Sequence, residues 1–147
     1  MRSLLLVLIG LLLTACAAHE TTPSYTPGLG EFMSQLSYRH GKLWFAGQAQ
    51  NWALAAYELD EIEEGLEDTG RYHPEHHEVK AIPEQIKRYM TASIQQAHVA
   101  INEKTPSAFI QAYDAITAGC NACHQANGFG FNQLVRPVMN NFANQRF

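Results

Sequence analysis

Two cysteines and a histidine lie close together near the end of the chain, in the segment CNACH that runs from Cys120 to His124. Residues three and four apart lie on the same face of a helix. If this segment is helical, both thiols and the imidazole project from one face. The chain has only one other cysteine, Cys16. Cys120 and Cys123 therefore need a shared chemical explanation.

Several chemistries use thiols and imidazoles. Two thiols on one helical face can each add to a vinyl group of a haem, and the adjacent His124 can bind the iron. A zinc site needs about four ligands, of which only three are local here. A thioredoxin-like dithiol requires a βαβ context, and a Cys120–Cys123 disulfide would close a very small loop that gains little. We therefore interpret CNACH as an attachment motif for one covalently bound haem c (heme c).

The start of the chain predicts export. Arg2 precedes an apolar stretch over residues 4–13 that is too short to span a bilayer. The next residues, LTAC, resemble the lipobox of bacterial lipoproteins, in which Cys16 is lipidated. An ordinary secretory signal with an incidental Cys16 is the alternative. The lipobox resemblance implies a lipoprotein signal peptide over residues 1–15 and, because Ala17 follows the cysteine, a lipid-anchored periplasmic protein at the outer membrane.

Composition and charge restrict the class of protein further. A chain of 147 residues with 46% hydrophobic residues is sufficient for one domain with its own core. The net charge is −4 and no run of Lys or Arg is present, which argues against nucleic-acid binding. Residues 16–29 are rich in Thr, Pro and Ala and predict a flexible tether. The remaining domain covers residues 30–147.

Four stretches of this domain have apolar residues at the three-four spacing of a helix face. They begin near Gly30, Asn51, Pro83 and Pro106, and the second is expected to stop at 68–70. Short links imply antiparallel neighbours, so we predict an all-α, up-down-up-down four-helix bundle. An irregular C-terminal strap follows from residue 126, and its expected attachment points are Phe129, Phe131, Leu134, Val135 and Phe142.

A four-helix bundle with CNACH near the end of its last helix resembles the class II c-type cytochromes, the cytochrome c prime group. The resemblance covers about residues 30–125. It implies that Cys120 and Cys123 form the thioethers and that His124 is the proximal iron ligand. It also implies that the first helix faces the distal side of the haem.

Two residues on the apolar stripe of the first helix can donate to iron, Met33 and His40. At a rise of 1.5 Å per residue they are about 10 Å apart, so only one can lie over the iron. A buried imidazole needs a polar partner, which iron would supply. We therefore expect His40 to be the sixth ligand, with Met33 the second choice and an open site the third. Arg39 either pairs with a haem propionate, which its guanidinium matches well, or is a solvated surface residue.

A second group of candidate ligands lies in the link before the third helix. His73, His76 and His77 alternate with acidic residues in the sequence HPEHHE. Pro74 predicts a loop, and such clusters often lie in solvated loops without a metal. We leave metal binding, for example of copper, open for this loop.

The expected function is electron transfer by a membrane-tethered monohaem c-type cytochrome whose partners are redox proteins. The alternative is a haem protein that binds or senses NO or CO at an open distal face. No catalytic constellation is evident beyond the haem neighbours, so we do not expect an enzyme. The resemblance leaves a homodimer open, because class II bundles often dimerise.

Overall fold

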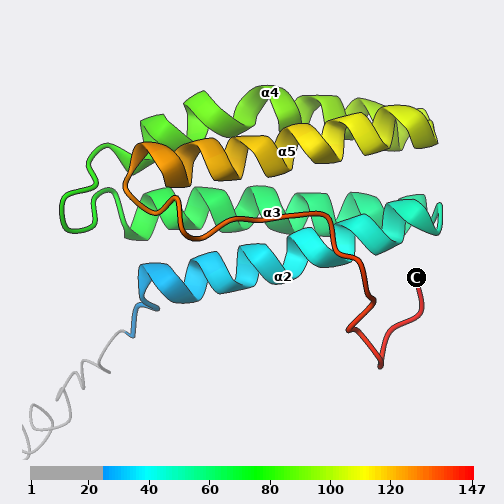
Figure 1. Ribbon diagram of the computed structural model, residues 1–147, viewed down its shortest axis with the longest axis horizontal. Coiled ribbons are helices and arrows are strands. Elements are labelled where there is room, and N and C mark those ends of the chain that lie inside the picture. Colours follow the sequence, from blue (N-terminus) through cyan, green and yellow to red (C-terminus); the bar gives the residue numbers. More distant parts are fainter. Residues whose placement is uncertain (1–24) are drawn as a thin grey trace, which may run out of the picture.

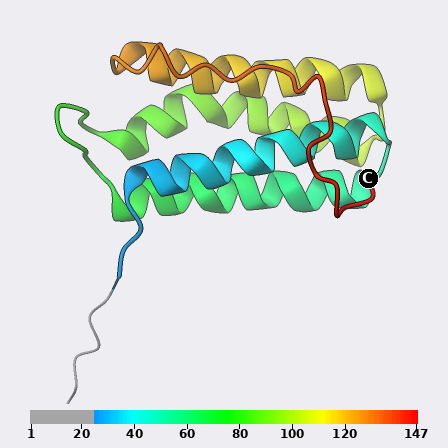
Figure 2. The same ribbon diagram turned by 60° about the horizontal axis from the view of Figure 1, so that its bottom comes forward.

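The computed structural model describes residues 25–147. Its helices, labelled as in Figure 1, are α2 (Leu29–Gln48), α3 (Trp52–Tyr72), α4 (Ile82–Asn102) and α5 (Pro106–Ala126). Successive helices run antiparallel and pack side by side, which confirms the predicted four-helix bundle (Figures 1 and 2). Over these residues the only β-structure is an isolated bridge between His76 and Val79.

Local capping explains where the helices begin. The Glu31 carboxylate accepts a hydrogen bond of 2.8 Å from the backbone N–H of Gly28 at the start of α2. The side chain of Asn51 accepts one of 3.2 Å from Leu54 N at the start of α3, a cap that contributes about 1 kcal/mol. Pro83 and Pro106 lie in the first turns of α4 and α5, where the missing N–H has no helical partner to lose.

The expected end of the second helix at 68–70 is wrong, because α3 continues to Tyr72. Gly70 does not cap the helix but lies against the start of α4. A Cβ at Gly70 would be 3.4 Å from the Cβ and Cγ atoms of Pro83, which is close to ordinary van der Waals contact. Gly70 therefore lies inside the helix, at the contact between α3 and α4.

The core consists of the predicted apolar stripes. Its largest fully buried apolar side chains come from α2, α3 and α5, and they are Leu43, Leu59, Phe109, Tyr113 and Ile116. Burying a side chain of this size contributes about 1.5–3 kcal/mol. This core fills the end of the bundle where α2 finishes and α5 begins.

Of the four neighbouring helix pairs, α2 and α5 make the weakest contact. They approach closely at one end, where a Cβ on Gly47 would lie 2.1 Å from the ring of Phe109. Further along, the rings of His40 and Tyr113 stack with their centroids 4.5 Å apart. Between the first half of α2 and the last half of α5 the two helices are separated by the cavity described below.

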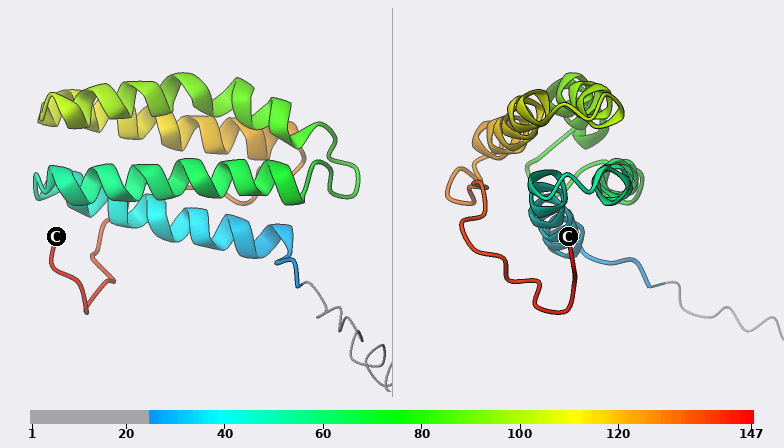
Figure 3. Two further views of the ribbon diagram at one scale, coloured as in Figure 1. Left: turned by 180° about the vertical axis from the view of Figure 1, so that it is seen from behind. Right: turned by 90° about the vertical axis from the view of Figure 1, so that its right-hand side faces the viewer.

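The segment after α5 is the irregular strap that the sequence predicts. It turns back along the bundle on the side where α2 and α5 are apart, and it ends beside α2 (Figures 1 and 3). Phe142 attaches it there, with its ring 5.1 Å from that of Tyr38 and 6.1 Å from that of Phe45, both on α2. The expectation that Phe131 and Val135 also attach the strap is wrong, since they are 83% and 70% exposed.

The predicted signal peptide, Cys16 and most of the tether lie outside the described residues. The last tether residues are held to the bundle: Tyr25 donates to the Glu31 carboxylate, and His73 Nε2 donates to the carbonyl of Pro27 over 2.8 Å. The helix begins at Leu29, so the tether stops short of its expected end at residue 29. Among helices α2 to α5, none is long and apolar enough to cross a bilayer.

Candidate functional site

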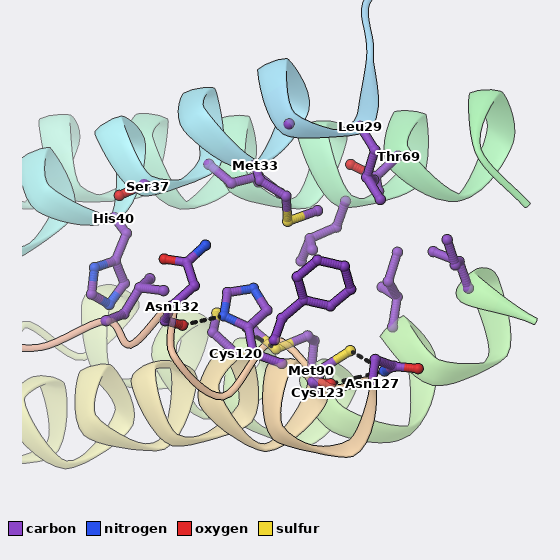
Figure 4. Close-up of a pocket in the computed structure, with 18 of the residues that line it drawn as sticks. Leu29, Met33, Ser37, His40, Thr69, Met90, Cys120, Cys123, Asn127 and Asn132 are labelled. Carbon is purple, nitrogen blue, oxygen red and sulfur yellow. Dashed lines mark hydrogen bonds between the residues drawn. The ribbon is translucent and has the colours of Figure 1, made fainter. Parts of the chain in front are cut away.

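A cavity of about 580 Å³ separates the first half of α2 from the last half of α5 (Figure 4). Its volume is in the range of small-molecule and cofactor sites. Most of its wall is apolar, and all four helices contribute to it, including Met33, Leu36, Ile62, Leu66, Ile86 and Ile116. Polar groups are interspersed in the wall: α2 contributes Ser34, Ser37 and His40, and the end of α5 and the strap contribute His124, Asn127 and Asn132.

The three chemically distinctive residues of CNACH all line this cavity. Cys120, Cys123 and His124 lie in the last turns of α5, so the prediction that the motif is helical and presents one face is confirmed. Neither cysteine is in a disulfide. Two free thiols and an imidazole therefore face one apolar chamber from one helix.

The surroundings of the thiols argue against a redox-active dithiol. Burial, helped by the neighbouring Cys123, raises the pKa of Cys120 to about 12, and its Sγ lies 4.0 Å from the sulfur of Met90. Burial also raises the pKa of Cys123. Thiol–disulfide enzymes need the opposite, a lowered pKa that yields the thiolate. Both thiols are protonated at neutral pH, which makes them poor attacking groups for disulfide exchange.

The side chain of His124 has a defined orientation. Its Nδ1 atom lies 2.7 Å from the backbone carbonyl oxygen of Asn132 on the strap (Figure 4). A carbonyl can only accept, so Nδ1 carries the proton. In the neutral ring this leaves the lone pair on Nε2, the atom that can bind a metal.

His40 also lines this cavity, but neighbouring side chains engage its ring. Its ring is 5% exposed, with Nε2 2.9 Å from the Thr117 hydroxyl and Nδ1 3.0 Å from the Tyr113 hydroxyl. Burial lowers the pKa of His40 to about 4, so the ring is neutral. Both ring nitrogens thus already have partners. Binding of iron by His40 would require one of these hydrogen bonds to break.

Met33 is the other donor that the sequence singled out on this helix. It lines the same cavity, and its side chain extends from α2 into the space between α2 and α5 (Figure 4). No hydrogen bond occupies its sulfur. Of the two candidates, Met33 is therefore the one whose donor atom is available without rearrangement, which reverses the order of preference from the sequence.

Arg39 does not line the cavity. Its guanidinium lies 3.2 Å from Glu58 and 2.7 Å from Glu61, both on α3. Glu58 is fully buried and also pairs with Lys42, whose Nζ is 2.6 Å from its carboxylate. Arg39 was expected either to pair with a haem propionate or to be a solvated surface residue. It is part of an ion-pair network that joins α2 to α3.

The loop histidines are only partly associated with the cavity. His76 lines it, and the rings of His76 and His77 are 4.1 Å apart. The nitrogens of His73, His76 and His77 do not converge on one point. Within residues 25–147, the only group with three potential ligand atoms within 4.8 Å of one another is a different one, composed of Asp60, Glu63 and His98.

Sequence reasoning missed this second group, because its members come from two different helices. Asp60 and Glu63 share a face of α3 at i, i+3 spacing, but His98 comes from α4, so only packing brings it near. His98 Nε2 donates directly to the Glu63 carboxylate. That hydrogen bond accounts for the contact without a metal.

The cavity thus combines an apolar chamber, two thiols and a free imidazole nitrogen from α5, and a thioether from α2. This donor set would suit a covalently attached haem, which Cys120, Cys123 and His124 would hold from α5 and Met33 from α2. Comparison of the chain with protein-family models, with curated proteins and with solved structures finds no match in any of the three. The function is therefore inferred from the site.

Proposed function

We propose that the protein is a monohaem c-type cytochrome that carries electrons in the periplasm. One observation carries the proposal: Cys120, Cys123 and His124 line a single, largely apolar cavity of about 580 Å³. Cys120 and Cys123 hold the haem through thioethers, and His124 binds the iron through Nε2. The haem supplies a one-electron Fe(III)/Fe(II) couple when bound.

Met33 is the sixth ligand in this proposal. Its support is the free thioether on the cavity wall and the engagement of both nitrogens of His40. Thioether and imidazole as the axial pair raise the reduction potential relative to two imidazoles, because a thioether is a weak donor to Fe(III). The apolar wall acts in the same direction, since low polarity disfavours the more highly charged oxidised state.

The membrane attachment rests on the sequence. LTAC and the apolar stretch before it support lipidation of Cys16. The tether keeps the bundle near the membrane, which raises its effective concentration for redox partner proteins at that surface. Such a carrier needs no catalytic residues of its own.

The test is to produce the full chain with haem-attachment machinery and to ask whether haem stays bound after denaturation. We expect haem staining of the denatured band and a reversible one-electron titration of the native protein. The Cys120→Ala/Cys123→Ala double variant should lose the staining, whereas Cys16→Ser, the matched control at the remaining cysteine, should keep it. Complete extraction of haem by acid-acetone, or the absence of a reversible couple, would contradict the proposal.

The alternative, a protein that binds NO or CO, differs in its sixth coordination position. A prompt change in the spectrum of the reduced wild-type protein on addition of CO would favour it. The available sulfur of Met33 supports a protected iron instead, for which we expect no prompt change.

A further inference from the structure

The strap crosses the end of α5 at a fixed register. The side-chain amide of Asn121, on α5, donates to the carbonyl of Leu134 over 2.9 Å and accepts from the N–H of Leu134 over 2.8 Å. Both backbone groups of one strap residue are thereby paired with one side chain. A slip of the strap by a single residue would break both hydrogen bonds at once.

This register determines which backbone group meets the CNACH histidine. Asn132 is two residues before Leu134, and its carbonyl oxygen accepts from His124 Nδ1 over 2.7 Å. His124 and Asn121 are three residues apart and therefore lie on the same face of α5, about one turn from each other. The same turn of α5 thus holds the strap at Leu134 and donates a hydrogen bond to the strap carbonyl at Asn132.

The strap has a second attachment that is independent of this turn. Arg136 makes a two-point ion pair with Asp114, one arm of which is 2.6 Å long, and its guanidinium lies 5.2 Å from the ring centroid of Trp44. Asp114 is two turns before Asn121 on α5. The strap can therefore be loosened at Arg136 without changing the partner of His124.

We infer that the strap is a positioning device for the proximal ligand, in which Asn121, by holding Leu134, sets the Asn132 carbonyl on Nδ1 of His124. The inference rests on the haem-binding function proposed above. A hydrogen bond at Nδ1 selects the tautomer with a free Nε2, fixes the orientation of the ring and makes it a stronger donor. A stronger proximal donor stabilises Fe(III), so the strap lowers the reduction potential.

Asn121→Ala removes both contacts with Leu134 and tests the device in the holoprotein. We expect its midpoint potential to be higher than that of the wild type. We also expect the His124 Nδ1 proton, followed by NMR, to exchange with solvent on the order of tenfold faster, the factor that the loss of one net hydrogen bond implies. Asn121→Asp keeps the acceptor for Leu134 N–H, so its midpoint potential and its exchange rate should lie between those of the wild type and of Asn121→Ala.

Arg136→Ala is the matched control. It loosens the strap at its other attachment but leaves Asn121 and Asn132 in place, so we expect the potential and the exchange rate of the wild type. If both variants change the potential equally, the strap acts only as a general cover and the inference is wrong. It is also wrong if Asn121→Ala changes neither quantity.

Two outcomes separate this inference from the proposed function. If the protein carries no haem, the proposed function fails, and the ¹⁵N shifts of His124 in the wild-type protein still report its tautomer. A proton on Nδ1 that is protected from exchange supports the positioning role of the strap, and a proton on Nε2 refutes it. If Asn121→Ala does not fold, the inference is tested by the tautomer of His124 in the wild-type protein and by the midpoint potential of Asn121→Asp.

Discussion

Nε2 of His40 lies 2.9 Å from the hydroxyl oxygen of Thr117, and this contact joins α2 to α5 where the cavity ends. The Thr117 hydroxyl donates to the carbonyl of Tyr113 over 2.9 Å, so its oxygen is free to accept the Nε2 proton. Nδ1 then accepts from the Tyr113 hydroxyl. His40 is thus a hydrogen-bonded member of the helix interface, which is why Met33 is the sixth ligand in the proposed function.

The first prediction concerns the axial ligand. Met33→Ala should abolish the near-infrared sulfur-to-iron band of the oxidised holoprotein and open the iron to CO. His40→Asn, whose side-chain amide oxygen can take the place of Nδ1 and keep the hydrogen bond from Tyr113, should keep that band. Absorption spectra from the visible to the near infrared check both variants. A low-spin wild-type protein that lacks the band would restore His40 as the ligand.

The second prediction concerns pH. The His40 pKa is about 4 in the folded protein and 6.5 when the side chain is exposed, so between these values only the unfolded chain binds the proton. The contribution of His40 to the free energy of unfolding is therefore fully present above pH 6.5. It is lost as the pH is lowered towards about 4, and the total loss is about 3 kcal/mol. Urea unfolding of the haem-free protein over this range measures the loss.

His40→Asn is the control for the pH prediction, because an amide does not titrate. Its free energy of unfolding should depend less on pH than that of the wild-type protein over the same window. Equal slopes for the two proteins would mean that another group causes the acid sensitivity.

The third prediction concerns the buried carboxylate of α3. Glu58→Ala leaves the cationic groups of Lys42 and Arg39 without their central partner, and Lys42 is only 8% exposed. Breaking a buried pair in this way costs about 3–5 kcal/mol. Glu61→Ala removes a partly exposed partner of Arg39 and should cost about 0–1 kcal/mol. Denaturant unfolding of the two variants should differ accordingly, and similar losses would contradict the central role of Glu58.

The fourth prediction concerns the close approach of α2 and α5. In Gly47→Ala the new methyl group would lie 2.1 Å from the Phe109 ring, and we expect a loss of about 1–3 kcal/mol. Gly30→Ala is the matched change on the same helix, where a Cβ meets nothing within 4 Å. Because alanine favours the helix, this change should stabilise by up to about 1 kcal/mol. Thermal unfolding of both haem-free variants provides the comparison.

The fifth prediction concerns the lipid. The full-length protein should partition with membranes, and Cys16→Ser should release it, because one acylated cysteine is the only anchor that the sequence predicts. Mass spectrometry of the mature N-terminus identifies the modification. An unmodified N-terminus after Ala15, or at another position, would show that the lipobox interpretation is wrong.

The helices could be predicted from the sequence because helix formation depends on neighbours within a few residues. Apolar spacing, the Asn51 cap and the prolines at 83 and 106 are local signals, and they correctly predict the bundle. The same local geometry places Cys120, Cys123 and His124 on one face. The extension of α3 beyond Gly70 was not predicted, because a glycine near a helix end is a local stop signal, whereas Gly70 lies inside the helix beside Pro83 of α4.

The partners of polar side chains depend on packing between distant segments. Arg39 and His40 are adjacent in the sequence, yet Arg39 pairs with α3 and His40 with α5, because successive residues of α2 face different neighbours. The attachment of Leu134 to Asn121 likewise requires the strap to fold back along α5. Residue spacing therefore predicted which groups could bind a haem, and the tertiary structure decided which of them are free to do so, because a donor is available only where no neighbouring element already satisfies it.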